Sequence, residues 1–218
     1  MMKEKLTLLL AATMLFACSK SSSESGIVKL DSAGTKQLEP AATTAGVLLS
    51  ADGPGNTYEL INSVFAGTGN VIEAPDCSHL PFGRHISEVY DSDLQTNVFA
   101  FTIHLSPDND KCQDSDRQRN EIKTYNQSPA NLLAVHNERV EYKWKFKLDA
   151  GFKPSGDFTH IHQIKPIDGP NTLPIITLTP RYKASGDVMQ VIHQDNDTTT
   201  PQAYLAQIPL SGFKGEWV

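Results

Sequence analysis

The sequence lacks several features that would define a function at once. It has three cysteines and two tryptophans among 218 residues. It contains no internal repeat, no phosphate-cradling glycine loop and no Gly-x-Ser-x-Gly elbow, so the usual signatures of nucleotide-binding proteins and α/β-hydrolases are missing. Basic residues are in deficit, 19 against 25 acidic ones, which gives a net charge of −6 at pH 7. A nucleic-acid binder is therefore not expected, and a site for a polyanion would have to be a local basic patch.

Apolar runs long enough to span a bilayer are also absent. The N-terminal run, residues 6–16, has about 11 residues, against about 20 for a transmembrane helix. It follows a short basic start and ends at Ala17-Cys18, which resembles the lipobox of bacterial lipoproteins. The resemblance implies that residues 1–17 are a signal peptide, that Cys18 is lipidated, and that a lipid anchor alone holds the exported protein in the periplasm or at the outer membrane. An ordinary secretory signal with an incidental cysteine is the alternative.

The remaining chain divides by composition. Residues 18–44 are rich in Ser, Ala, Thr and Lys and poor in large apolar side chains, which predicts a flexible tether. Residues 45–218 are long enough for one domain with a real core, which we expect to be monomeric. The strand-like segment 208–218 stops on Trp217-Val218. This abrupt stop has two interpretations, a final strand tied into a sheet and a truncated reading frame.

If Cys18 is lipidated, Cys77 and Cys112 remain as a pair. In an oxidising compartment they are expected to form a disulfide. The bridge would close a loop of about 35 residues and stabilise the fold by roughly 3–4 kcal/mol on the chain-entropy estimate. Two separate buried thiols are the alternative, whereas two lone cysteines so far apart lack the spacing of metal ligands.

Strand patterns dominate the chain. β-rich or alternating segments are separated by turn clusters at 106–110, 153–157, 168–171 and 195–197. This spacing predicts an all-β fold, a sandwich or jelly roll. Helix signals are weak, and residues 57–65 fit a short helix or a strand. The strand-like segments are residues 98–105, 116–125, 141–148, 158–165, 173–179 and 187–193.

Two of these segments carry ionisable side chains on one face. Because side chains alternate along a strand, Arg119, Glu121 and Lys123 should share one face, and so should His160 and His162. Together they predict a basic, histidine-bearing groove for an acidic polymer. A surface strand with a ladder of ion pairs, and two half-buried histidines, are the alternatives. No third ligand is evident that would make the histidine pair a metal site.

The stretch from His85 to Arg181 resembles the glucuronan lyases of polysaccharide lyase family 20 and, more loosely, the alginate lyases. The resemblance implies a concanavalin-like jelly roll with a concave groove that cleaves a uronic-acid polymer by β-elimination and requires no cofactor. The Asp-rich turns 108–110 and 195–197 leave a structural calcium site open. The matching segments are residues 85–89, 98–105, 116–125, 142–148, 158–165 and 177–181.

Elimination from a uronate needs a cation to neutralise the carboxylate, a base for the C5 proton and an acid for the departing oxygen. By the resemblance, Arg119 is the neutraliser, Glu121 orients it, and Lys123 replaces the second arginine of the family's Arg-x-Glu-x-Arg motif. His162 is the base, and His160 lies near the substrate carboxylate.

Further positions are secondary. Gln163 should point away from His162 unless a bulge intervenes, while His85 and Arg181 would line the groove. His104 fits a core histidine better. The catalytic tyrosine strand of the related lyases has no match here, so the acid is unassigned. A non-catalytic carbohydrate-binding lipoprotein and an inactive fragment are therefore the competing hypotheses, and the identity of the polyuronate stays open.

Overall fold

The computed structural model describes residues 8–13, 19–21, 46–135, 137–168, 173–195, 197 and 199–218, the first two segments as backbone only. Cys18, residues 1–7 and 14–17 of the expected signal peptide, and residues 22–44 of the expected tether lie outside the described residues. Their assignments stay predictions. Among the described residues, no helix combines the length and apolar content needed to cross a bilayer.

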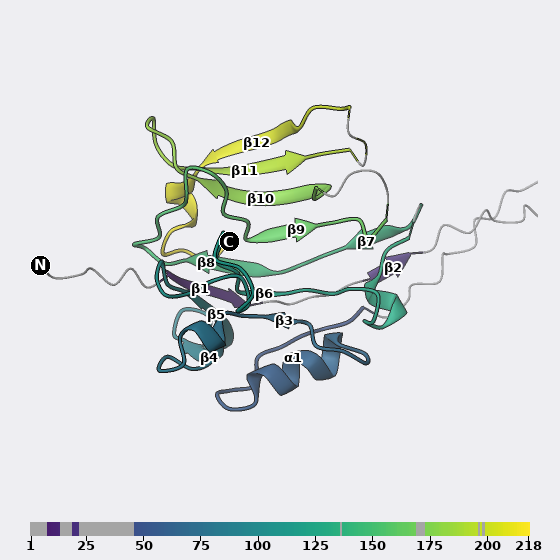
Figure 1. The fold of residues 1–218 in the computed structure, drawn as a ribbon, viewed down its shortest axis with the longest axis vertical. Coiled ribbons are helices and arrows are strands. Elements are labelled where there is room, and N and C mark those ends of the chain that lie inside the picture. Colours follow the sequence, from purple (N-terminus) through teal and green to yellow (C-terminus); the bar gives the residue numbers. More distant parts are fainter. Residues whose placement is uncertain are drawn as a thin grey trace, which may run out of the picture. The chain divides into compact units, whose positions relative to one another are not determined.

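The described chain is mostly β-structure in antiparallel sheets, with one short α-helix, so the all-β expectation is confirmed (Figure 1). Helix α1 spans Thr57–Phe65, and the short 3-10 helices η1, η2 and η3 span Asp76–Ser78, Ala130–Leu132 and Leu210–Phe213. The strands are β1 (Leu8–Thr13), β2 (Ser19–Ser21), β3 (Ile72–Glu73), β4 (Ile86–Asp91), β5 (Thr96–Ile103), β6 (Glu121–Ile122), β7 (Arg139–Glu141), β8 (Lys145–Leu148), β9 (His162–Ile164), β10 (Ile176–Arg181), β11 (Val188–His193) and β12 (Ala203–Pro209).

The chain divides into two compact units. The first unit comprises residues Met1–Ala11, Thr102–Ser106 and Phe146–Val218, and the second comprises Ala12–Phe101 and Pro107–Lys145. The predicted site residues after residue 146 therefore fall in the first unit, together with His104, whereas His85, Arg119, Glu121 and Lys123 fall in the second.

The first unit is built on a four-stranded antiparallel sheet in the order β12-β11-β10-β9 (Figure 1). The strand pairing places Leu178 opposite Val191 and, on the other side, opposite His162. One face of this sheet packs on an apolar cluster formed by Leu148, Phe152, Met189 and Leu210, with Phe146, Ile161, Leu178 and Phe213 around it. Burial of this face is what holds the sheet, since each large apolar side chain contributes roughly 1.5–3 kcal/mol.

The alternation predicted for residues 141–148 is present. Leu148 is fully buried and Phe146 packs on the same cluster, whereas Lys143 and Lys145 are exposed. The last residue, Val218, exchanges two backbone hydrogen bonds with Phe146, each 3.0 Å long.

In the second unit, α1 forms because its apolar side chains recur with helical spacing. Thr57, Ile61 and Phe65, four residues apart, are its buried residues, and this stripe defines the packed face. β4 and β5 pair in register from Ile86 opposite Phe101 to Asp91 opposite Thr96. β5 supplies a continuous buried run over residues 98–102, as its apolar sequence predicts.

Cys77 and Cys112 are joined by a disulfide, the pairing that the sequence predicts. Their Cα atoms lie 6.0 Å apart across a sequence separation of 35 residues. The bridge ties η1 to the loop that follows β5.

Candidate functional site

The face of the β9–β12 sheet opposite the apolar cluster is mostly polar. Residues paired across strands share a face, and Gln163 lies opposite Thr177, Thr179 opposite Gln190, and Gln190 opposite Gln207. Three of these side chains, Thr177, Thr179 and Gln190, are buried. We call this set, together with His160, Arg181 and Tyr204, the polar face. Buried polar groups persist only when they are hydrogen-bonded, and the polar face meets that condition through two short chains of contacts.

The first chain fixes the state of His160. The Thr179 hydroxyl donates to Thr177 Oγ1 at 2.9 Å, so its oxygen is the acceptor for His160 Nδ1 at 2.8 Å. In the neutral imidazole that geometry puts the proton on Nδ1 and leaves Nε2 with the lone pair. Packing of the ring and then the positive charge of Arg181 lower the His160 pKa. His160 is therefore neutral at neutral pH, with Nε2 able to accept a proton.

The second chain holds Arg181. Its Nε donates to Gln190 Oε1 at 2.7 Å, and Gln190 Nε2 donates to Gln207 Oε1 at 3.1 Å. The guanidinium also donates to the backbone oxygens of Gly156 and Asp157. Arg181 is thus a cation held in one orientation on the polar face, near His160.

Tyr204 reaches the same face because β12 is irregular. The register shifts between Val191 and Ile192, so that Ile192 pairs with Tyr204 rather than with Leu205. Ile192 also pairs with Thr177, which belongs to the polar face. The Tyr204 side chain is 52% exposed, so its hydroxyl is accessible to a ligand on this face.

The expectation that His160 and His162 share a face is wrong. β9 begins at His162, and residue 161 forms a bend. His160 contacts Thr179 on the polar face, whereas His162 lies opposite Leu178, on the face of the apolar cluster. Burial lowers the pKa of His162 to about 4. Gln163 does lie on the face opposite to His162, as the alternation predicts.

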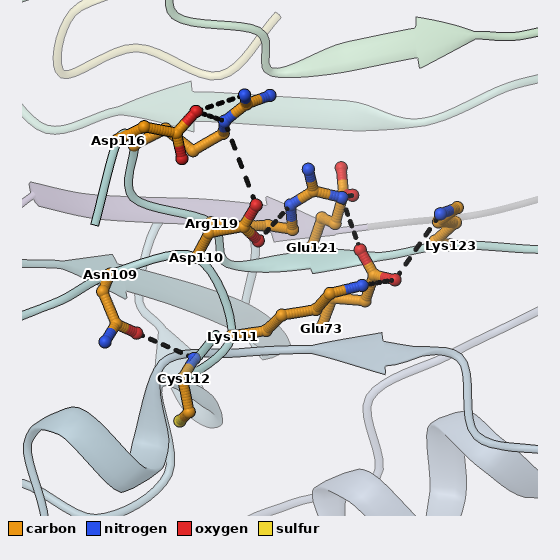
Figure 2. A network of polar contacts seen from close by, with 10 residues as sticks. Glu73, Asn109, Asp110, Lys111, Cys112, Asp116, Arg119, Glu121 and Lys123 are labelled. Carbon is orange, nitrogen blue, oxygen red and sulfur yellow. Dashed lines mark hydrogen bonds and ion pairs between the residues drawn. The ribbon is translucent and has the colours of Figure 1, made fainter. Parts of the chain in front are cut away.

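In the second unit, Arg119, Glu121 and Lys123 do share one face, and Figure 2 shows Arg119 and Lys123 directed at Glu73, with Glu121 beside Arg119. Arg119 Nη1 lies 2.6 Å from Glu73 and 3.0 Å from Glu121, and its Nε lies 2.8 Å from Asp110. Lys111 and Lys123 bind the same Glu73 carboxylate at 2.9 and 3.5 Å. We call these six residues the Glu73 network.

The sheet explains why two acidic residues meet here. Glu73 on β3 is the direct partner of Glu121 on β6, and like charges facing each other repel unless a cation bridges them. Arg119 supplies that bridge. Burial raises the pKa of Glu73, but hydrogen bonds from Lys111 and Arg119 outweigh it and lower that pKa to about 2. Burial instead raises the pKa of Glu121.

Arg119 therefore has three carboxylate partners of its own. Because Glu73, Asp110 and Glu121 already compensate its charge, it is poorly placed to neutralise a substrate carboxylate. The sequence leaves two interpretations of this strand open, a basic groove and a surface ladder of ion pairs. The contacts of Arg119 fit the ladder of ion pairs. Glu121 does contact Arg119, as expected of an orienting residue.

His85 does not line an open groove. It is 1% exposed, and its two ring nitrogens contact Asp76 and Asp108. In the turn 108–110, Asp108 faces His85 and Asp110 pairs with Arg119, and the calcium site that the sequence leaves open stays a prediction. His104 follows β5 by one residue and falls in the first unit.

Sequence reasoning missed Glu73, Thr179, Gln190 and Tyr204. Thr179 and Gln190 lie in strands that the sequence predicts, and the strand alternation could have placed them with Arg181. Glu73 lies in a two-residue strand without a periodic signal, and Tyr204 depends on the irregularity of β12. Comparisons of the chain with protein-family models, with curated proteins and with solved structures found no match.

Proposed function

We propose that this protein binds an acidic polysaccharide on the polar face of the β9–β12 sheet and cleaves it as a polysaccharide lyase. The observation that carries the proposal is the hydrogen-bonded polar layer on a sheet whose other face packs on an apolar cluster. Thr177, Thr179 and Gln190 are buried, so a ligand would meet the half-buried or exposed side chains of this face: Gln163, Arg181, Tyr204 and Gln207. Their amide, guanidinium and hydroxyl groups suit a polyhydroxylated, negatively charged ligand. A jelly roll is the fold we propose for the whole chain, and glucuronan is the first substrate to test.

The polar face supports a division of roles that differs from the one predicted. Arg181 would bind the uronate carboxylate, so that negative charge can build on it in the transition state. His160 Nε2 would take the C5 proton, because it carries the lone pair and belongs to a neutral ring. The electrons of the C5–H bond would form the C4–C5 double bond as the C4–O bond breaks. Tyr204 would donate its proton to the departing oxygen.

The proposal moves the base from His162 to His160. His162 lies on the opposite face, where burial opposes its protonation. Arg119 keeps a structural role, since three carboxylates surround it. The exported lipoprotein form, with Cys18 lipidated, remains part of the prediction.

The test is incubation of the protein with glucuronan, alginate and other polyuronates, with ultraviolet absorbance reporting the unsaturated product. The wild type should release product, and His160→Ala should lower the rate by roughly 10²–10⁴-fold, the usual size of a proton-transfer role. His162→Ala serves as the matched comparison, with thermal unfolding measured for both. Absence of product from every polyuronate with a folded protein would refute the lyase function, and full activity of His160→Ala would refute the assignment of His160 as the base.

A non-catalytic binding protein is the second candidate, favoured by the absence of any match for the family's tyrosine strand. It predicts that polyuronates bind without turnover and that Arg181→Ala abolishes this binding. Glycan binding measured by calorimetry, alongside the absorbance assay, separates the two functions.

A further inference from the structure

The second unit holds a buried cluster of imidazole and carboxylate groups, separate from the polar face. His79 follows η1, His85 immediately precedes β4, and Asp108 lies in the loop after β5. One donor atom from each of the three lies within 4.8 Å of the others. Two segments distant in sequence, one with His79 and His85 and the other with Asp108, therefore bring three potential metal ligands to one place.

The spacing of these atoms fits a small divalent cation. Asp108 Oδ1 lies 3.2 Å from His85 Nε2 and 3.4 Å from His79 Nδ1. Ligands at about 2.0–2.1 Å from a tetrahedral zinc ion are separated by roughly 3.3 Å. The two distances match the edges of that tetrahedron, and the three donors leave its fourth position for water or another side chain.

Asp76 orients His85 in the way that metal-binding histidines require. His85 Nδ1 lies 2.9 Å from Asp76 Oδ1, and the same oxygen accepts the His85 backbone N–H at 3.0 Å. Tyr58 on α1 donates its hydroxyl to both Asp76 oxygens, at 3.1 and 2.9 Å. With the Nδ1 proton directed at Asp76, Nε2 faces Asp108 with its lone pair. A carboxylate that holds the far nitrogen of a ligand imidazole is the usual second layer of a zinc site.

Burial favours a positive charge at this cluster. The side chains of His85 and Asp108 are both fully buried, and the Phe82 ring packs 4.8 Å from the His85 ring and 5.5 Å from the His79 ring. A carboxylate removed from water is costly unless a cation compensates it. A metal ion bound by His79 Nδ1, His85 Nε2 and Asp108 Oδ1 would supply this charge.

The disulfide links the chain segment that carries His79 to the segment that carries Asp108. Cys77 precedes His79 by two residues, and Cys112 follows Asp108 by four. Asn120 additionally donates to the His85 backbone oxygen at 2.8 Å. The donor segments are thus fixed before any ion arrives, which lowers the entropy cost of binding.

We propose that His79, His85 and Asp108 bind a first-row divalent cation, zinc foremost, with Asp76 as the positioning residue. Two nitrogen donors and one carboxylate disfavour calcium and magnesium, which prefer oxygen ligands. The proposal is independent of the glycan-binding face. It gives the second unit an ion that cross-links η1, the start of β4 and the loop after β5.

The test is metal analysis of the purified protein, followed by calorimetric titration of chelator-stripped protein with Zn²⁺. One ion per chain is expected for the wild type. His79→Ala and Asp108→Asn should each abolish binding, and Asp76→Asn should weaken it by about 10–100-fold, as for other second-layer partners. His193→Ala, which removes an imidazole on β11 of the first unit, is the matched control and should bind as the wild type does.

Two further measurements distinguish loss of the metal site from misfolding of a variant. Zn²⁺ should raise the melting temperature of the wild type and of His193→Ala, because an ion that binds only the native state stabilises it. It should not raise the melting temperature of folded Asp108→Asn, which lacks the intact site. Co²⁺ in place of zinc should give the visible absorption of a tetrahedral site. Failure of stripped wild type to bind either ion, or unchanged binding by folded Asp108→Asn, would overturn the site.

Discussion

At the scale of single residues, Glu73 gathers as many opposite charges as Arg119 does, although no periodic pattern in the sequence singles it out. Its carboxylate binds Arg119, Lys111 and Lys123. Because three cations depend on it, its loss leaves them without their common partner. Glu121, which the sequence places in the same motif, contacts Arg119 at 3.0 Å.

The first prediction concerns Glu73→Gln. We expect a loss of about 1–3 kcal/mol in the free energy of unfolding at neutral pH, because a charge-assisted contact is replaced by a weaker one. The folded pKa of Glu73 is lowered, from 4.5 to about 2, so its stabilisation is present above about pH 4.5 and is lost as the pH falls towards 2. Urea denaturation across this range measures it. Glu121→Gln is the comparison, and an equal or larger loss there would contradict the ranking.

The second prediction concerns His162. Burial lowers its folded pKa from 6.5 to about 4. The unfolded chain therefore binds more protons between these values, and stability should fall as the pH drops from 6.5 towards 4, by at most about 3 kcal/mol. His162→Gln should flatten this part of the stability–pH curve. The same slope in wild type and variant would show that another group titrates.

At the scale of elements, small departures from regular strands decide what the polar face contains. A bend at residue 161 separates His160 from His162, and an irregularity in β12 brings Tyr204 rather than Leu205 opposite Ile192. A one-residue change of register moves a side chain to the other face. The composition of this sheet's two faces thus depends on two local features.

The third prediction tests the threonine pair on β10. Thr179→Val keeps the shape of the side chain and removes the hydroxyl that lies between His160 and Thr177. We expect a cost of about 1–2 kcal/mol, and nitrogen NMR of the His160 ring should show that the Nδ1–H tautomer is no longer preferred. Thr177→Val leaves the His160 contact in place and should keep the tautomer. Identical ring spectra for the two variants would contradict the assigned direction of the hydrogen bonds.

At the scale of the whole molecule, the disulfide stabilises the fold and the proposed metal site together. Its loop of 35 residues includes His79, His85 and Asp108. Cross-linking removes conformational freedom from the unfolded chain. It also keeps the His79 and Asp108 segments close in the folded one.

The fourth prediction follows from this double role. Replacing both Cys77 and Cys112 by serine should lower the free energy of unfolding by roughly 3–4 kcal/mol and weaken Zn²⁺ binding. Chemical unfolding and calorimetry measure the two effects. Unchanged zinc affinity in a folded double variant would show that the bridge stabilises the chain without positioning the ligands.

The sequence was informative where a physical rule acts over short distances. The strand pattern, the pairing of Cys77 with Cys112 and the shared face of Arg119, Glu121 and Lys123 all follow from alternation or from simple counting. The position of Glu73 does not, because its strand has only two residues and its partner Glu121 lies far along the chain. The burial of His85 likewise depends on Asp76, Asp108 and Phe82, which no local pattern links.

By itself, then, the sequence determined that this is a β-rich chain with a disulfide and with ionisable side chains set on strand faces, since side-chain alternation and redox chemistry act on the chain directly. The tertiary structure decided which of these side chains act together. It paired Arg119 with three carboxylates, parted His160 from His162 and enclosed His85 with Asp108. These outcomes follow from strand register, a bend and long-range burial, and such contacts arise only when distant segments pack against one another.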